Sequence, residues 1–226
     1  MWRSLIGSSG WGKAQLRGGF LLGVLLILNA CAGPSVEAIR ADLKAGRSPG
    51  AFIADVPFIA QREYYCGPAS LAMVLQFWGE SVGQDEIASE LFIESIKGTL
   101  NFDLEFYARR RGFRAESFRG TLDSLKAEIA RGRPLIVFLD LGAGPFKFPH
   151  FAVVTGYDES RRLVIAHSGT TANRLIPYWE FERTWAAKGN WTLLITPKSP
   201  AGSLKDRKRK ETGYGTSTHF SGEAPK

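Results

Sequence analysis

The apolar positions divide the chain into a helical first part and a strand-rich second part. Residues 69–78, ASLAMVLQFW, are apolar on nearly every side and are followed by Gly79, as in a buried helix. Further helices are predicted at residues 84–92, 101–111 and 121–130, with a short strand at 113–118. β-Branched and aromatic runs between turn residues then predict four strands, at residues 134–140, 150–158, 162–168 and 191–197. This order predicts an α+β fold with N-terminal helices packed on a C-terminal antiparallel sheet.

The positive charge of the chain is concentrated at its two ends. The net charge is +7, but residues 1–30 contain Arg3, Lys13 and Arg17 and no acid. Residues 199–226 contain six Lys or Arg against three Asp or Glu. The part between them is nearly neutral, whereas a nucleic-acid-binding domain concentrates basic residues on its folded part. No nucleic-acid partner is expected.

The first 31 residues have the features of a bacterial export signal. Positive charges precede the apolar run GGFLLGVLLIL at residues 18–28, which is too short to span a bilayer because a spanning helix needs about 20 apolar residues. The next step, Leu28-Asn29-Ala30-Cys31, resembles the lipobox of bacterial lipoproteins. The resemblance implies a lipid on Cys31, and Ala32 after it favours the outer membrane, facing the periplasm. A plain signal peptide cut nearby and an uncleaved anchor are the alternatives.

The domain organisation follows from these composition changes. We predict a lipoprotein signal peptide at residues 1–30, a lipidated N-terminus and tether at 31–51 and one globular domain at 52–198. Residues 199–226 are rich in Ser, Gly and charge and predict a disordered basic tail.

One cysteine of the globular domain stands where a nucleophile is expected. The chain has two cysteines, and lipidation of Cys31 would leave Cys66 as a lone thiol outside the cytoplasm. Cys66 precedes Gly67-Pro68 at the start of the first predicted helix, where the helix dipole and free N–H groups favour a thiolate and a lowered pKa. His150, at the head of a predicted strand, is the candidate base. Core packing is the alternative role of such a cysteine.

These residues resemble the papain-like cysteine peptidases, specifically the family of bacteriocin-processing (double-glycine leader) peptidases. The matching segments are VPFIAQREYYCGPASLAMVLQFWG at residues 56–79 and PHFAVVTGYD at 149–158. The resemblance implies a papain-like fold in which Cys66 is the nucleophile and His150 the general base and acid. It also implies that Gln61 donates a hydrogen bond to the oxyanion, with the backbone N–H of Cys66 as the second donor.

The third catalytic residue departs from the family pattern. The family has an Asp on the strand after the histidine strand, but this chain reads Val164-Ile165-Ala166-His167-Ser168-Gly169 there. His167, Ser168 and Asn173 are the alternatives for the group that orients His150.

The sequence therefore predicts a lipid-anchored cysteine peptidase of the cell envelope, acting on a peptide or protein substrate. No cofactor is expected, and no zinc site of the usual spacing can be formed with two cysteines, one of them lipidated. A catalytically weak peptide-binding or scaffold lipoprotein, and a thioester-forming amidase or acyltransferase, are the alternative functions.

Replacement of Cys31 tests the anchor. Cys31→Ser should release the protein from membranes or stall its processing, because the sulfur that carries the lipid is lost. Membrane fractionation with a radiolabelled fatty acid measures this. Equal membrane association and no loss of label would contradict the lipobox interpretation.

Overall fold

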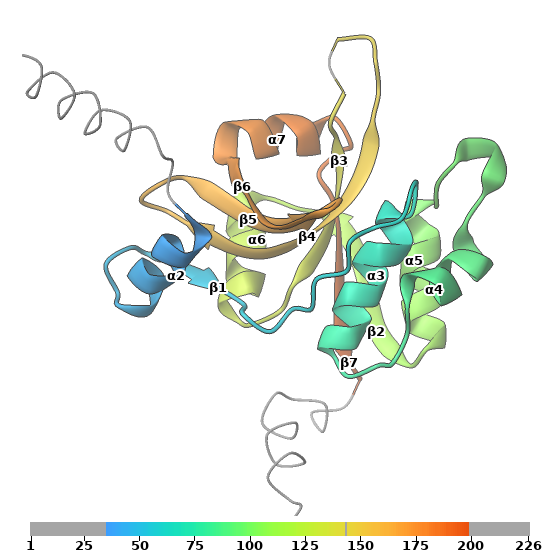
Figure 1. The fold of residues 1–226 in the computed structure, drawn as a ribbon, viewed down its shortest axis with the longest axis horizontal. Coiled ribbons are helices and arrows are strands. Elements are labelled where there is room, and N and C mark those ends of the chain that lie inside the picture. The colour runs from blue at the N-terminus through green and yellow to red at the C-terminus, as the bar shows by residue number, and fades with distance from the viewer. Residues whose placement is uncertain (1–34, 143, 199–226) are drawn as a thin grey trace, which may run out of the picture. The chain divides into compact units, whose positions relative to one another are not determined.

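The computed structural model describes residues 35–142 and 144–198 (Figure 1). The chain divides into two compact units, residues 1–38 and 39–226, and of the first unit only residues 35–38 are described. The predicted signal peptide, the lipid site Cys31 and the basic tail lie outside the described residues. Among the described helices, none is long and apolar enough to cross a bilayer.

Seven strands form one antiparallel sheet in the order β2-β7-β3-β4-β5-β6, with β1 beside the second half of β4. The strands are β1 (Gly50–Phe52), β2 (Phe113–Arg119), β3 (Leu135–Asp140), β4 (Pro149–Asp158), β5 (Leu163–Ser168), β6 (Thr171–Pro177) and β7 (Trp191–Pro197). Successive residues of β3 and β4 are buried, so both faces of the sheet are covered at its centre.

The helices pack around this sheet. They are α2 (Val36–Lys44), α3 (Cys66–Phe77), α4 (Gln84–Leu91), the 3-10 turn η1 (Glu94–Ile96), α5 (Asn101–Arg110), α6 (Leu122–Ala130) and α7 (Tyr178–Ala186). Helices α3, α4 and α5 pack together, with α3 against β3 and β4 and α5 against β2 and β7. Helix α6 contacts β1, β3 and β4, and α7 contacts β3, β5 and β6. The predicted α+β class is confirmed.

Helix α3 is the buried helix that the sequence predicts, and it begins earlier than expected. Nearly every side chain from Gly67 to Phe77 is buried. The helix starts at Cys66, three residues before the predicted residue 69, so Pro68 is its third residue. Because the N–H of that position has no partner within the helix either, proline costs no hydrogen bond there. At the far end, Trp78 Nε1 donates to the carbonyl of Ile195 at 2.8 Å and ties the helix to β7.

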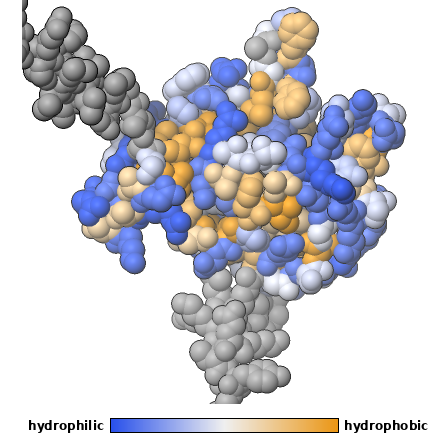
Figure 2. Space-filling model, viewed as in Figure 1, coloured by the Kyte–Doolittle hydropathy of each residue, from blue (hydrophilic) through white to orange (hydrophobic). Residues whose placement is uncertain are grey.

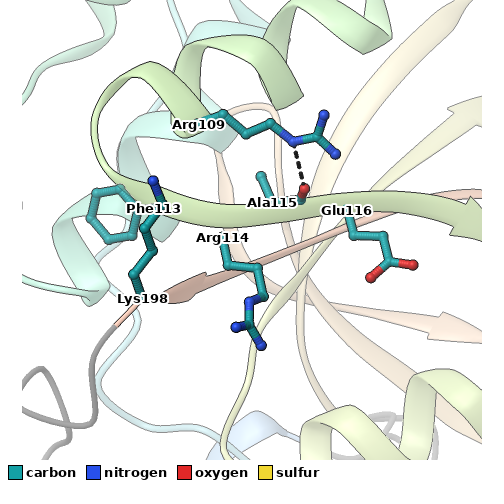
Figure 3. Close-up of a pocket in the computed structure, with 6 residues that line it drawn as sticks. All are labelled: Arg109, Phe113, Arg114, Ala115, Glu116 and Lys198. Carbon is teal, nitrogen blue, oxygen red and sulfur yellow. Dashed lines mark hydrogen bonds between the residues drawn. The ribbon is translucent and has the colours of Figure 1, made fainter.

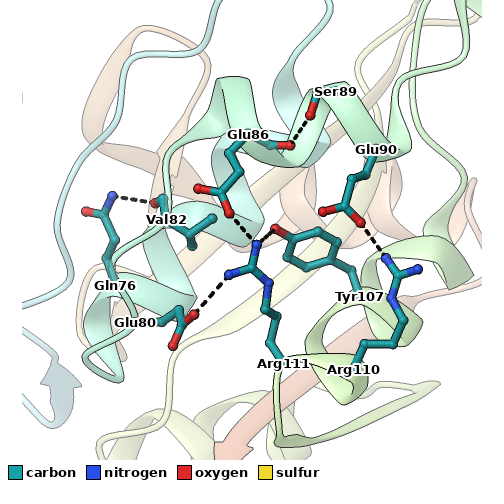
Figure 4. Close-up of polar contacts among 9 residues, drawn as sticks. All are labelled: Gln76, Glu80, Val82, Glu86, Ser89, Glu90, Tyr107, Arg110 and Arg111. Atoms are coloured by element: carbon teal, nitrogen blue, oxygen red, sulfur yellow. Dashed lines mark hydrogen bonds and ion pairs between the residues drawn. The ribbon is translucent and has the colours of Figure 1, made fainter.

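An ion network joins the three packed helices (Figure 4). Arg111, which follows α5, pairs with Glu86 of α4 and with Glu80 at 3.1 Å, and donates to the hydroxyl of Tyr107 at 2.7 Å. Arg110 pairs with Glu90 at 2.8 Å. The end of α5 is thereby held to α4 and to the turn after α3.

Several elements were not predicted. The described part of the expected tether forms α2 and β1, and Ile39 of α2 is fully buried. The polar composition of residues 31–51 favoured a tether, although Val36, Ile39 and Leu43 of α2 are spaced as on one face of a helix. Strand β6 and helix α7 were also missed. β6 is an exposed edge strand with polar residues, whereas Tyr178, Phe181 and Trp185 of α7 have the spacing of a helix face, so this helix could have been predicted.

A buried carboxylate connects the segment after α2 to the end of β4. Asp158 is fully buried, accepts the Ser48 hydroxyl at 2.8 Å and pairs with Arg161 at 2.7 Å. Burial alone would raise the pKa of Asp158, but the hydrogen bonds from the Arg161 backbone, Ser48 and the Arg161 side chain outweigh it and hold the pKa below its ordinary value.

Replacing Asp158 should therefore destabilise the protein in a pH-dependent way. Asp158→Ala should lower the free energy of unfolding by about 3 kcal/mol at pH 7, because Arg161 loses its negative partner and Ser48 loses its hydrogen-bond acceptor. The stabilisation is present above the ordinary carboxyl pKa and disappears as the pH falls through the lower folded pKa. Urea unfolding at pH 7 and pH 3 should show the difference from wild type shrinking at pH 3. Arg47→Ala, which removes a 62% exposed partner of Asp42, is the control and should change little.

Candidate active site

Cys66 is presented by a tight turn at the start of α3. The turn is closed by the Tyr65 N–H, which donates to the Arg62 carbonyl at 3.0 Å. Tyr64 has a φ of +63°, in the left-handed region that residues other than glycine rarely adopt. Its ring lies under the ammonium group of Lys97, 5.2 Å from the ring centroid. The left-handed residue redirects the chain into α3, so that its first residue is the cysteine.

The environment of the Cys66 thiol favours the neutral form. Burial raises the pKa of the thiol, while hydrogen bonds with the backbone of Phe151, Gly67 and Cys66 itself oppose this in part. The expectation that the helix terminus would lower the pKa is therefore wrong for this conformation. The helix terminus does contribute, but the desolvation of a half-buried thiol outweighs it.

Gly67 explains how the thiol comes so close to the sheet. A Cβ at this position would lie 3.2 Å from Thr99 Cβ and 3.4 Å from Phe151 Cδ2. Since the glycine has no side chain, the first turn of α3 can lie directly against β4. The Cys66 thiol consequently reaches the backbone of Phe151, the residue that follows His150.

The register of β4 and β5 places His150 beside Ser168. Ala152 is opposite Ser168, and His150 shares the face of Ala152 because side chains alternate along a strand. His150 Nε2 lies 3.0 Å from Ser168 Oγ. Ser168 is thus the one of the three proposed orienting residues that hydrogen-bonds to His150. Within the described chain no hydrogen bond joins the imidazole to the Cys66 thiol, as is common before a substrate binds.

His150 is a neutral base at physiological pH. Burial and the positive charge of Arg174 lower the pKa of His150 to about 4. A carboxylate in place of Ser168 would favour the charged imidazolium, but a hydroxyl supplies no charge.

His167 lies on the opposite face of the sheet. It is in register with Val153, so its side chain points away from the face of His150. Its Nδ1 accepts the N–H of Asn173 at 3.1 Å, and its Nε2 is 3.1 Å from the carbonyl of Val56. Because Nδ1 accepts, Nε2 carries the proton and donates to that carbonyl. His167 therefore anchors the coil before α3 to β5, and the structure does not bring it to His150.

Gln61 lies in that same coil, five residues before Cys66. Its N–H donates to the Gly169 carbonyl at 3.1 Å. Its side-chain oxygen would lie 4.0 Å from a Cβ on Gly169, and in the described structure the side-chain amide has no hydrogen bond. The amide is therefore available to an incoming group.

Exposed apolar side chains stand on two connections near the ends of the elements that carry the site. Phe146 and Phe148 are 79% and 59% exposed in the β3–β4 connection, which projects at the top of Figure 2 as an orange tip. Ile96 and Leu100 are exposed between α4 and α5. Asp140 Oδ1 accepts the N–H groups of Gly142 and Phe148 and fixes the base of the β3–β4 connection.

A cavity of about 740 Å³ lies elsewhere, at the start of β2 (Figure 3). Its lining residues are Arg109, Phe113, Arg114, Ala115, Glu116 and Lys198. None of the predicted catalytic residues lines it. Within residues 35–142 and 144–198, no three His, Cys, Asp or Glu side chains are grouped as a metal ion would require.

The sequence profile of the Peptidase_C39 like family matches residues 53–193. The chain belongs to the peptidase C39-like family. Membership supports cysteine peptidase activity, and the matched range contains Gln61, Cys66 and His150. No curated protein sequence matches the chain.

Solved structures of C39-like peptidases share the fold. A C39-like peptidase from Bacillus anthracis is 19% identical, with a TM-score of 0.55 over 67% of this chain and 100% of that one. The double-glycine motif protease of an AMS/PCAT transporter, solved with its leader peptide, is 24% identical, with a TM-score of 0.50 over 65% and 95%. The peptidase domain of Streptococcus ComA is 20% identical, with a TM-score of 0.52 over 63% and 99%. The predicted papain-like α+β fold is confirmed.

Titration of His150 tests the effect of the missing acid. The imidazole should titrate near pH 4 in the wild type. Ser168→Asp should raise this pKa by about 1 to 3 units, because a carboxylate beside Nε2 favours the imidazolium. NMR of the imidazole nitrogens measures both values, and Ser168→Ala is the uncharged control. A wild-type midpoint at or above the ordinary value of about 6.5 would contradict the buried, uncompensated ring.

Proposed function

We propose that this protein is a cysteine peptidase that cleaves peptide bonds through an acyl-enzyme on Cys66. The observation that supports this best is the placement of Cys66 at the start of α3, against the backbone of the residue after His150, in a C39-like chain. In this proposal His150 is the base, Ser168 orients it and Gln61 holds the oxyanion. His167 serves as an anchor of the coil.

The reaction starts from an uncharged pair. The thiol pKa is raised and the His150 pKa is lowered, so neither group is ionised near pH 7. When a peptide carbonyl is bound, His150 takes the thiol proton as the sulfur bonds to the carbonyl carbon. In this proposal His150 Nε2, 3.0 Å from Ser168 Oγ, carries the proton and donates to the hydroxyl, which leaves Nδ1 to accept the thiol proton. The Gln61 side chain and the Cys66 N–H stabilise the negative oxygen.

The intermediate then collapses and is hydrolysed. The C–N bond breaks, and His150 returns its proton to the leaving amine. A water molecule, deprotonated by His150, attacks the thioester and releases the carboxylic acid and the thiol. A serine at the orienting position stabilises the imidazolium less than an acid would, which favours slow turnover.

Slow turnover of the peptidase reaction favours one second candidate function, that of a peptide-binding protein with the same fold. The specific observation is that no carboxylate within residues 35–142 and 144–198 pairs with His150, together with the raised thiol pKa. A substrate peptide fits both candidates, since a leader peptide is bound to the related transporter protease.

We further propose that the domain is tethered to the cell envelope through a lipid on Cys31.

Digestion of a peptide library by the purified protein, read by mass spectrometry, tests the peptidase. Cys66→Ala should abolish cleavage and also controls for contaminating proteases. Gln61→Ala should reduce turnover about 100-fold, with the rate of thiol alkylation unchanged, because its role begins only when the oxyanion forms.

The pH dependence of alkylation tests the uncharged resting state. Alkylation of wild-type Cys66 should rise only above the ordinary thiol pKa of about 8.5, since the thiolate is the reactive form. A rate that is already at its plateau below pH 7 would show a preformed ion pair. Absence of both cleavage and a trapped thioester, with retained peptide binding, would favour the binding protein.

A further inference from the structure

An oxyanion donor must be fixed before the reaction starts, and Gln61 lies in an irregular segment. Residues 53–65 between β1 and α3 form neither helix nor strand. Such a segment has no ladder of backbone hydrogen bonds to hold it, and a displacement of about 1 Å at a catalytic group can cost 100-fold in rate. Something else must fix the backbone around Gln61.

The side chain of Gln84, the first residue of α4, binds the peptide groups on both sides of Gln61. Its Nε2 donates to the carbonyl of Ala60 at 3.0 Å, and its Oε1 accepts the N–H of Arg62 at 2.9 Å. One end of the amide donates and the other accepts, so both bonds form in only one orientation of the amide. Gln61 is the single residue between the two bonded peptide groups.

A third bond holds Gln61 from the side of the sheet. The Gln61 N–H donates to Gly169, next to Ser168. The backbone at 60–62 is thus fixed by bonds to two separate elements, while the Gln61 side chain remains unbonded in the described structure.

Gln84 does not serve its own helix. The residue before it, Gly83, forms no side-chain cap, and Asp85 and Glu86 supply the acidic first turn. The amide of Gln84 is directed instead at the coil before Cys66.

We propose that Gln84 is a positioning residue that sets Gln61 for oxyanion binding. The proposal rests on the role assigned to Gln61 under the proposed function. Gln84 does not touch the substrate; it acts through the backbone of Ala60 and Arg62.

A neighbouring contact provides the matched control. Arg62 and Asp85 also join the coil to α4, at 2.6 Å, but their side chains are 66% and 64% exposed. An exposed ion pair of this kind contributes little to the stability of the contact between the coil and α4. Asp85→Asn therefore removes the ion pair between the same two segments without altering the Gln84 amide.

Kinetics of five variants test the proposal. Gln84→Ala should lower kcat roughly 10- to 100-fold with little change in KM, while alkylation of Cys66 by iodoacetamide stays at the wild-type rate. Gln84→Glu keeps an acceptor for Arg62 but loses the donor to Ala60, and should be impaired as well. Gln61→Ala/Gln84→Ala should be no slower than Gln61→Ala alone, because Gln84 acts only through Gln61. Asp85→Asn should match the wild type.

Two outcomes would overturn the proposal. One is that Gln84→Ala lowers kcat by the same factor in the Gln61→Ala background as in the wild type. The other is a parallel loss of alkylation and melting temperature, which would make Gln84 a general stabilising residue. If the wild type shows no Cys66-dependent cleavage, the proposed function fails. Hydrogen exchange of residues 53–65 then still tests whether the Gln84 side chain fixes the backbone around Gln61. Exchange there should rise in Gln84→Ala and not in Asp85→Asn, and an unchanged rate refutes it.

Discussion

The close packing of the first turn of α3 on β4 is the constraint on which the site depends. A Cβ on Gly67 would be in tight contact with Thr99 and Phe151, and this close packing accompanies the contact of the Cys66 thiol with the backbone next to His150. The left-handed residue Tyr64 lets the preceding coil turn sharply into the helix. The same coil carries Gln61. One helix end and one strand thus assemble groups that are far apart in the sequence.

The ionisation states of Cys66 and His150 are the second property that defines the site. A half-buried thiol and a buried imidazole disfavour their ionised forms, and among the described residues no carboxylate pairs with either of them. Ser168 fixes the direction of the His150 ring without lending it charge. The site is therefore ordered by hydrogen bonds rather than by ion pairs, and its reactivity depends on what a bound substrate adds.

Sequence patterns predicted the elements with strong periodicity and the residues within a motif. The helix of residues 69–78 and the strand of residues 150–158 agree with α3 and β4 to within a few residues. The edge strand β6 buries too little apolar surface to give a signal, whereas the apolar spacing of α2 lies within a polar segment that by composition favoured a tether. The choice of Ser168 over His167 required the strand register, because a shift of one residue exchanges the two faces of a sheet. The raised pKa of the thiol could not be predicted because it depends on the burial of Cys66 in the folded chain. The contacts of Gln84 could not be predicted because they join residues that are 22 and 24 positions apart.

The protonated state of Cys66 has a consequence for the durability of the protein. The thiolate is the form that attacks peroxides and disulfides, so a thiol that remains protonated is oxidised slowly. Cys66 is a free cysteine, and its partial burial limits access further. In the proposed location outside the cytoplasm, exposed thiolates are converted to sulfenic acids and mixed disulfides, and such a residue would persist in reduced form. In the proposed peptidase, the burial that keeps the thiol protonated at rest would thereby also protect the nucleophile from oxidation.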